Sequence, residues 1–245
     1  MAGGAVSKAS EELARRIKIL GAHLLQCKPD ETKLKDGAVY KGDASVTLKQ
    51  IAQAWYLRPD LLPDTIETTG MEVTEGYKPK IDTGVFTYAT HAAVVEVDIE
   101  TGHVDILDYV IFEDCGTRVN PLILDGQSYG GAAQGIGTAL FEEVIYDSAG
   151  QPLTSTLADY ILPGAAELPS FRLGHSESPS PYSRHGIKGV GEGAAIAPSG
   201  ALVNAINDVL APLGAEINSI PATPHRILAA IFTARDGVQT TRAPE

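Results

Sequence analysis

The chain has 245 residues, of which 44% are hydrophobic and 20% charged, an ordinary composition for a globular protein with a sizeable core. Its 31 acidic and 19 basic residues give a formal net charge of −12 with histidines neutral, which argues against nucleic acid and anionic membranes as main partners. No apolar run approaches the roughly 20 residues of a membrane-spanning helix, and the first residues lack a signal-peptide pattern. We therefore expect a cytoplasmic protein without membrane insertion.

The N-terminal region is predicted to contain a helix, a small β element and a second helix. Leu13, Ile17, Leu20 and Leu24 recur at helical spacing within residues 7–27. Residues 33–47 read as a short strand pair, residues 47–56 as a helix, and residues 57–80 as a long loop. We place a boundary in this loop and treat 1–75 as an N-terminal region.

The remaining residues, 76–245, alternate less regularly between strands and helices. A hairpin turns at Glu100-Thr101-Gly102, and a second one turns at Ala149-Gly150. Helices are expected over residues 126–144, 198–210 and 224–232, and residues 162–184 are expected to form a loop. Mixed elements without strict alternation predict an α+β fold.

Residues 126–137 contain five glycines in a predicted helix, at a cost of about 1 kcal/mol for each interior glycine. One interpretation is close packing against another helix. The other places Gln127 at the start of the helix, where its amide and the first backbone N–H groups can bind a polar ligand.

Glu192 lies between glycines in Lys188-Gly189-Val190-Gly191-Glu192-Gly193. Glycines on both sides permit unusual backbone angles and close approach to a bound group, and a carboxylate buried there would be a credible general base. The alternative is a surface turn with an incidental glutamate. Gly189, Gly191 and Ala194 also fit a loose dinucleotide-binding pattern, but no apolar strand precedes them.

The other candidates favour structural roles. Cys115 could be a nucleophile but is better explained as a small residue at a strand end, and His91 in a strand is better explained as a core histidine. Glu142 and Glu143 are expected to be solvated or locally paired. Two distant cysteines can form neither a disulfide framework nor a zinc site, and we assign no metal ligand in this chain.

Several motifs in order resemble the molybdopterin-binding large subunit of the xanthine dehydrogenase, aldehyde oxidase and carbon monoxide dehydrogenase family, specifically its C-terminal part. They are Thr87-Tyr88-Ala89-Thr90-His91, Asp114-Cys115-Gly116 with Asn120-Pro121, Gly126-Gln127, Gln134-Gly135-Ile136-Gly137, and Lys188-Gly189-Val190-Gly191-Glu192. Together they extend over some 150 residues, and the part before them also looks like the family.

The resemblance implies roles for individual residues. Glu192 matches the active-site glutamate that takes a proton from water or hydroxyl at the metal, and Gln127 matches a glutamine near the pterin. Gly189, Val190 and Gly191 would approach the cofactor through their backbones. Ala2, Gly3 and Gly4 would lie beside the cofactor where the first helix opens.

The family's large subunit is usually about three times longer, and this chain lacks its N-terminal half. The resemblance therefore implies a second polypeptide that completes the site, an iron–sulfur subunit and a FAD subunit. It also implies molybdenum with molybdopterin, in the cytosine dinucleotide form. The function implied is the catalytic part of a molybdenum hydroxylase acting on an aldehyde or N-heterocycle. The alternative is a non-catalytic structural partner or fragment of such a subunit.

Overall fold

The structure, a computed structural model, describes residues 1–62, 70–81 and 84–240. By its internal contacts the chain divides into two compact units, Met1–Asp82 and Thr83–Glu245. Each unit has its own hydrophobic core, and the two contain the mixed helices and strands expected of an α+β protein.

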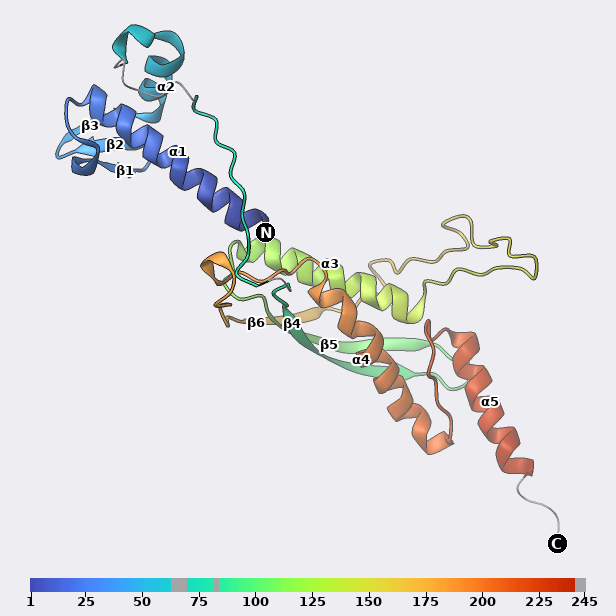
Figure 1. Cartoon of the computed structure of the whole chain (residues 1–245). Helices are drawn as coiled ribbons and strands as arrows, with labels where there is room; N and C mark the ends of the chain where they lie inside the picture. The colour runs from blue at the N-terminus through green and yellow to red at the C-terminus, as the bar shows by residue number, and fades with distance from the viewer. Residues whose placement is uncertain (63–69, 82–83, 241–245) are drawn as a thin grey trace. The chain divides into compact units, whose positions relative to one another are not determined.

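The N-terminal unit packs α-helices on a small antiparallel sheet (Figure 1). Its elements are α1 (Ala2–Leu24), β1 (Lys33–Lys35), β2 (Ala38–Lys41), β3 (Ala44–Thr47) and α2 (Leu48–Leu57), with strand order β1-β2-β3. Thr47 and Gln50 form a capping box that fixes the start of α2. Leu20, Val39, Val46 and Ile51 form the core of this unit.

The C-terminal unit is built on a second three-stranded sheet of order β4-β5-β6. Strands β4 (Tyr88–Val97) and β5 (Val104–Asp114) form the expected antiparallel hairpin. Strand β6 (Phe171–Ser176) then adds to β5 in parallel, which places the ends of both strands at the same edge of the sheet.

Helices cover one face of this sheet (Figure 1). Helices α3 (Pro121–Leu140) and α4 (Gly193–Leu210) pack against each other and the strands, and α5 (Pro224–Thr240) adds Ile227 and Ile231 to the same core. The opposite face exposes several large apolar side chains beside polar ones: Tyr88, Val94, Leu107 and Phe112 are each at least 50% exposed.

Several predicted boundaries are wrong. The first helix starts at Ala2 instead of residue 7, the strand pair at 33–47 has three strands, and α5 continues past Phe232. Part of the predicted 57–80 loop, residues 63–69, lies outside the described residues. Helix α3 begins at Pro121 rather than at Gly126, because Asn120 accepts a hydrogen bond from the backbone N–H of Ile123 and Pro121 occupies the first turn.

Two larger corrections concern β6 and the start of α4. The predicted 162–184 loop contains β6. The prolines on both sides of this strand suggested a loop, and the strand pairs with β5, which is distant in sequence. Helix α4 begins at Gly193, five residues before the predicted start at Pro198. Pro198 lies inside the helix, where it packs against Gly135 of α3.

The expectation about apolar runs also needs correction. Residues Gly193–Leu213 are long and apolar enough to cross a membrane by length and composition alone. Within this unit, however, α4 buries Leu202, Ile206 and Leu210 completely against the other elements, as a core helix does.

Candidate active site

Two consecutive carboxylates at the end of β5 organise the region around Glu192. Glu113 and Asp114 point to opposite faces of the sheet, as neighbouring residues of a strand must, and their exposed fractions are 0% and 2%. Buried carboxylates need hydrogen bonds or opposite charges, so the partners of each one are informative.

Asp114 is paired with Lys188. The Lys188 Nζ lies 2.9 Å from Asp114 Oδ1 and 4.3 Å from the centre of the Tyr88 ring. Asp114 also accepts hydrogen bonds from the backbone N–H of Gly116 and the hydroxyl of Ser176. This network fixes the residue at which the 188–192 segment begins.

The pKa values follow from this network. Burial pushes the pKa of Asp114 upward, but the hydrogen bonds from Ser178, Gly116 and Lys188 outweigh it and hold the pKa well below its usual range. Burial likewise pushes the pKa of Lys188 down, and the bond to Asp114 more than compensates, so its pKa is raised. Both groups are charged near neutral pH.

The backbone attaches the same segment to the sheet. Lys188 N–H donates to the Cys115 carbonyl at 2.9 Å, and Ile187 forms an antiparallel bridge with Gly116. His185 and Gly186, just before it, adopt the left-handed conformation with φ values of 61° and 73°. The strained turn therefore lies before the predicted cofactor loop and not within it.

This observation corrects one expectation. Gly189, Gly191 and Gly193 have no positive φ, so glycine is not required there for unusual backbone angles. A Cβ on Gly191 would lie 3.7 Å from the Gln127 side-chain nitrogen, an ordinary van der Waals contact that does not require a glycine either. A Cβ on Gly189 would meet nothing within 4 Å, so packing within this chain does not require that glycine.

Glu192 immediately precedes α4 and occupies its N-cap position without a side-chain capping hydrogen bond. Its side chain is exposed, so the burial expected of a general base is not provided by the described residues. Glu192 borders a shallow depression between α3 and α4 that Gln134 and Thr138 also line. The backbone of Glu192 is therefore fixed at the start of α4, whereas its carboxylate is open to solvent.

Gln127 lies in the second turn of α3 and not at the start of the helix, which corrects that expectation. Its side chain is exposed and reaches the backbone of Gly191, so the fold does bring Gln127 and the loop preceding Glu192 together. The fold thus places the Gln127 amide beside Gly191, while the Glu192 carboxylate, one residue later, borders the depression lined by Gln134 and Thr138.

The glycines of α3 have two different surroundings. Added Cβ atoms at Gly131 and Gly135 would lie 3.2 Å and 2.6 Å from atoms of α4, so these glycines permit the close helix packing that was one interpretation. Added Cβ atoms at Gly126 and Gly130 would meet nothing within 4 Å. These positions leave backbone accessible on either side of Gln127.

The remaining predicted cofactor residues, Ala2, Gly3 and Gly4, belong to the N-terminal unit and form the first turn of α1. Ala2 and Gly3 are exposed. Gly4 is buried against the ring of Tyr77, where an added Cβ would lie 2.5 Å from ring carbons. Gly4 thus has a packing role within its own unit.

The weaker candidates have structural surroundings. Cys115 is buried, and burial raises the pKa of its thiol, which disfavours a nucleophile. His91 bonds the Tyr109 hydroxyl at 2.9 Å, and burial lowers its pKa. Glu142 accepts a hydrogen bond from Tyr160, and Glu143 pairs with Arg226; both carboxylates are paired, although the partner of Glu143 is distant in sequence.

The dinucleotide-binding alternative does not fit the local structure. The glycines at 189 and 191 follow a short helical turn, Arg184–Gly186, and an isolated β-bridge at Ile187. A parallel strand that feeds directly into the glycine loop is required for that motif, and residues 177–192 contain none.

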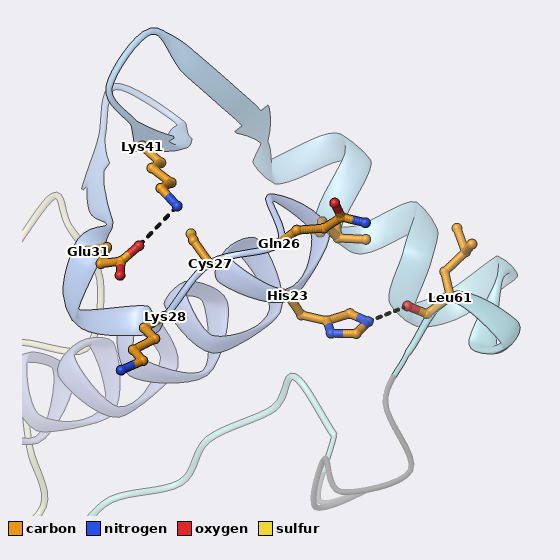
Figure 2. Close-up of a pocket in the computed structure, with 8 residues that line it drawn as sticks. His23, Gln26, Cys27, Lys28, Glu31, Lys41 and Leu61 are labelled. Carbon is orange, nitrogen blue, oxygen red and sulfur yellow. Dashed lines mark hydrogen bonds and ion pairs between the residues drawn. The ribbon is translucent and has the colours of Figure 1, made fainter.

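A wide depression in the N-terminal unit is unrelated to these residues. It is lined by His23, Cys27, Glu31, Lys41 and Leu61 among others (Figure 2). Its polar groups are engaged with each other: Lys41 pairs with Glu31 at 3.0 Å, and His23 bonds the Leu61 carbonyl at 3.0 Å. None of the residues predicted to bind cofactor lines it.

The donor set in the C-terminal unit fits a polar, anionic ligand such as a pterin dinucleotide. The exposed Gln127 amide lies beside the loop backbone at Gly191, and both can supply N–H donors to such a ligand. The missing side chains at Gly126, Gly130 and Gly189 leave space for that ligand.

The fold and this site define a cofactor-binding protein in which a helix-terminal glutamate lies beside a glycine loop. The family described as a molybdopterin cofactor-binding domain matches residues 1–169, and the chain belongs to it. Its place is in the molybdopterin-binding large-subunit region of the xanthine dehydrogenase family.

Known relatives extend the match beyond residue 169. The chain is 34% identical to the nicotine 6-hydroxylase large subunit of Paenarthrobacter nicotinovorans, over 94% of its own length and 28% of that protein. It is 31% identical to the carbon monoxide dehydrogenase large chain of Hydrogenophaga pseudoflava, over 93% and 28%. Because the matches cover 94% and 93% of this chain, they extend past Glu192.

Solved structures agree. The crystal structure of quinoline 2-oxidoreductase from Pseudomonas putida 86 superposes with a TM-score of 0.78 and 38% identity, covering 92% of this chain and 29% of that one. The chain thus spans less than a third of the length of the relatives it matches.

Sequence reasoning missed the residues that support the site. Glu113, Asp114, Ser128 and Lys188 were assigned no role, although Asp114 and Lys188 lie within the family motifs. The available signal was a pair of carboxylates at the end of an apolar strand. Its partner, a lysine 74 residues later, could not be identified before the fold was known.

Proposed function

We propose that this chain is the catalytic part of a molybdenum hydroxylase and that Glu192 is its general base. The observation that carries the proposal is the position of Glu192 at the N-cap of α4, directly after Gly191, which lies beside the Gln127 amide. Family membership supports it, because the relatives are named as a hydroxylase, dehydrogenases and oxidases.

Each of these residues has a distinct task. Gln127 donates from its amide to the pterin, and Gly189, Val190 and Gly191 approach the cofactor through their backbones. The bound cofactor supplies the redox chemistry for hydroxylation with water-derived oxygen. Glu192 accepts the proton released from that oxygen, and its exposed carboxylate is sequestered from solvent only when the rest of the site is assembled. We assign a second cofactor contact to the Ala2–Gly4 turn, made by the exposed Ala2 and Gly3, while buried Gly4 packs that turn against Tyr77.

Another polypeptide completes the site. The relatives are more than three times as long as the portion this chain matches, and one of them is named as a subunit of a dehydrogenase complex. We assign to the assembly a polypeptide equivalent to the N-terminal part of the large subunit, an iron–sulfur subunit and a FAD subunit. The cofactor is the cytosine dinucleotide form, and the complex is cytoplasmic.

The substrate is an aldehyde or an N-heterocycle. The names of two relatives, nicotine 6-hydroxylase and quinoline 2-oxidoreductase, support the heterocycle in particular. Native purification from the source, followed by mass spectrometry and metal analysis, should recover a larger partner with molybdenum and iron. A chain that purifies alone and without metal would favour the non-catalytic alternative.

The decisive test is Glu192→Gln in the assembled enzyme. We expect turnover to fall by on the order of 10²–10⁴-fold, the usual contribution of a general base, while molybdenum content is unchanged. The matched control is Glu216→Gln, which alters an exposed glutamate after α4 and should leave turnover unchanged. Full activity of Glu192→Gln would reject the assigned role.

A further inference from the structure

Glu113 is fully buried, yet half of its carboxylate has no partner. Oε2 accepts a hydrogen bond of 2.6 Å from the Ser128 hydroxyl of α3, whereas Oε1 has no hydrogen-bond partner among the described residues. Buried polar atoms are satisfied in the great majority of cases, so this one requires an explanation. A buried oxygen without a hydrogen bond destabilises the folded chain, which indicates that Glu113 serves a purpose other than stability.

The free oxygen lies against the first residue of α4. A Cβ on Gly193 would be 2.5 Å from Glu113 Oε1 and 2.8 Å from Thr87 Cγ2. Gly193 follows Glu192 directly and has no positive φ, so the Glu113 carboxylate and the Thr87 methyl group together account for the glycine.

The two carboxylates at the end of β5 therefore hold the two ends of one short segment. Asp114 binds Lys188 on one face of the sheet, and Glu113 contacts Gly193 on the other. Between these two contacts the segment is free to present Glu192, whose side chain makes no capping bond of its own. The direction of the Glu192 side chain is then set by where α4 begins.

We propose that Glu113 is a positioning residue, which fixes the start of α4 and thereby the direction in which Glu192 faces the cofactor. The inference rests on the proposed role of Glu192 as the general base. The Ser128 hydroxyl of α3 donates a hydrogen bond to Glu113 of β5, and Glu113 packs against Gly193 at the start of α4.

The test combines kinetics of the assembled enzyme with amide hydrogen exchange of the full chain. Glu113→Ala should lower kcat on the order of 100-fold with little change in KM, because misplacement of a reacting group by about 1 Å has an effect of that size. Exchange across residues 188–196 should rise by about tenfold or more, as expected when a local contact is lost. Glu113→Gln keeps an acceptor for Ser128, so its kcat and its exchange across residues 188–196 should both be close to those of the unmodified enzyme.

A double-mutant cycle covers the case in which Glu113→Ala folds poorly. Gly193→Ala should impair turnover in the presence of Glu113, and Glu113→Gln should relieve little of that effect. Glu113→Ala removes the nearer of the two clashing atoms, while Thr87 Cγ2 remains, so the Gly193→Ala and Glu113→Ala effects should be partly non-additive. Strict additivity would overturn the proposed contact.

The two proposals fail in different ways. If Glu192→Gln retains full turnover, the base assignment fails, and with it the positioning role. If Glu192→Gln is inactive while Glu113→Ala keeps normal kcat and normal exchange at 188–196, only the positioning role fails. Glu216→Gln serves as the control in both measurements and should change neither.

Discussion

The two ends of the loop that carries Glu192 differ in burial. Lys188 is buried in an ion pair with Asp114, and its ammonium lies over the Tyr88 ring. Four residues later, Glu192 is exposed and makes no capping hydrogen bond. The contacts that hold the loop are therefore concentrated at its first residue, and the residue proposed as the general base is its exposed last one.

Helix α3 repeats this contrast along its own length. Gly131 and Gly135 contact α4, whereas Gly126 and Gly130, beside Gln127, have open space around them. Positions that the chain itself fills should respond to mutation through stability. Positions that it leaves open should respond through cofactor binding or assembly, which makes the comparison testable.

Lys188→Met should give the largest loss of stability. The substitution keeps the length of the side chain but leaves Asp114 charged, buried and without its cation, which costs about 3–5 kcal/mol of unfolding free energy. Urea unfolding of the purified chain measures this. Lys49→Met, at an exposed lysine of α2, is the control and should stay within about 0.5 kcal/mol of the unmodified chain.

Glu192→Gln should leave the unfolding free energy unchanged in the same assay. Equal losses for Lys188→Met and Glu192→Gln would contradict the division of the loop into a stabilising end and a chemical end.

Acid should weaken the same ion pair to a smaller degree, because it neutralises one partner and leaves the hydrogen bonds in place. The pKa of Asp114 is depressed in the folded protein, so the unfolded chain binds more protons below its ordinary value of 3.8. The stability that Asp114 contributes is fully present above that pH and is lost as pH falls through the lower, folded pKa.

The measurement is the urea midpoint between about pH 5 and pH 3, where unfolded aspartates titrate. Asp114→Asn should be less stable at pH 5 and should lose less on acidification than the unmodified chain. Glu216→Gln should show the unmodified slope. Parallel slopes for Asp114→Asn and the unmodified chain would show that the pair contributes no pH dependence.

The sequence predicted the elements whose signals are local. Periodic leucines revealed α1, alternation around Gly102 revealed the β4–β5 hairpin, and both are confirmed. Strand β6 was missed because its pairing partner lies 62 residues earlier. The start of α4 was missed because Pro198 looked like a first-turn residue, and only the adjacent Gly135 makes room for it.

The candidate site was predictable to a similar extent. The glycines identified Glu192 and Gln127 as residues of interest, and the fold does bring Gln127 next to Gly191. The supporting residues were not predictable, because burial of Glu113 and Asp114 depends on two helices and a third strand that meet only in the folded chain. The identity of a charged residue in a sequence does not indicate whether its side chain will be buried.

The smallest expected effects concern two glycines of α3, and they test the contrast within that helix. Gly135→Ala places a methyl group 2.6 Å from the Ala195 carbonyl oxygen, which should cost about 1–3 kcal/mol through overpacking. Gly126→Ala meets no atom within 4 Å and should instead stabilise the chain by roughly 0.5–1 kcal/mol, the difference in helix propensity. Thermal and urea unfolding measure whether the free energy of unfolding falls for Gly135→Ala and rises for Gly126→Ala.

If the open space at Gly126 is reserved for the cofactor or for the completing polypeptide, Gly126→Ala should stabilise the isolated chain and still lower molybdenum content or partner recovery in the purified complex. If it raises stability and leaves assembly untouched, the glycine is merely tolerated there. In that case the ligand-facing part of α3 would begin beyond Gly126, at Gln127 and Gly130.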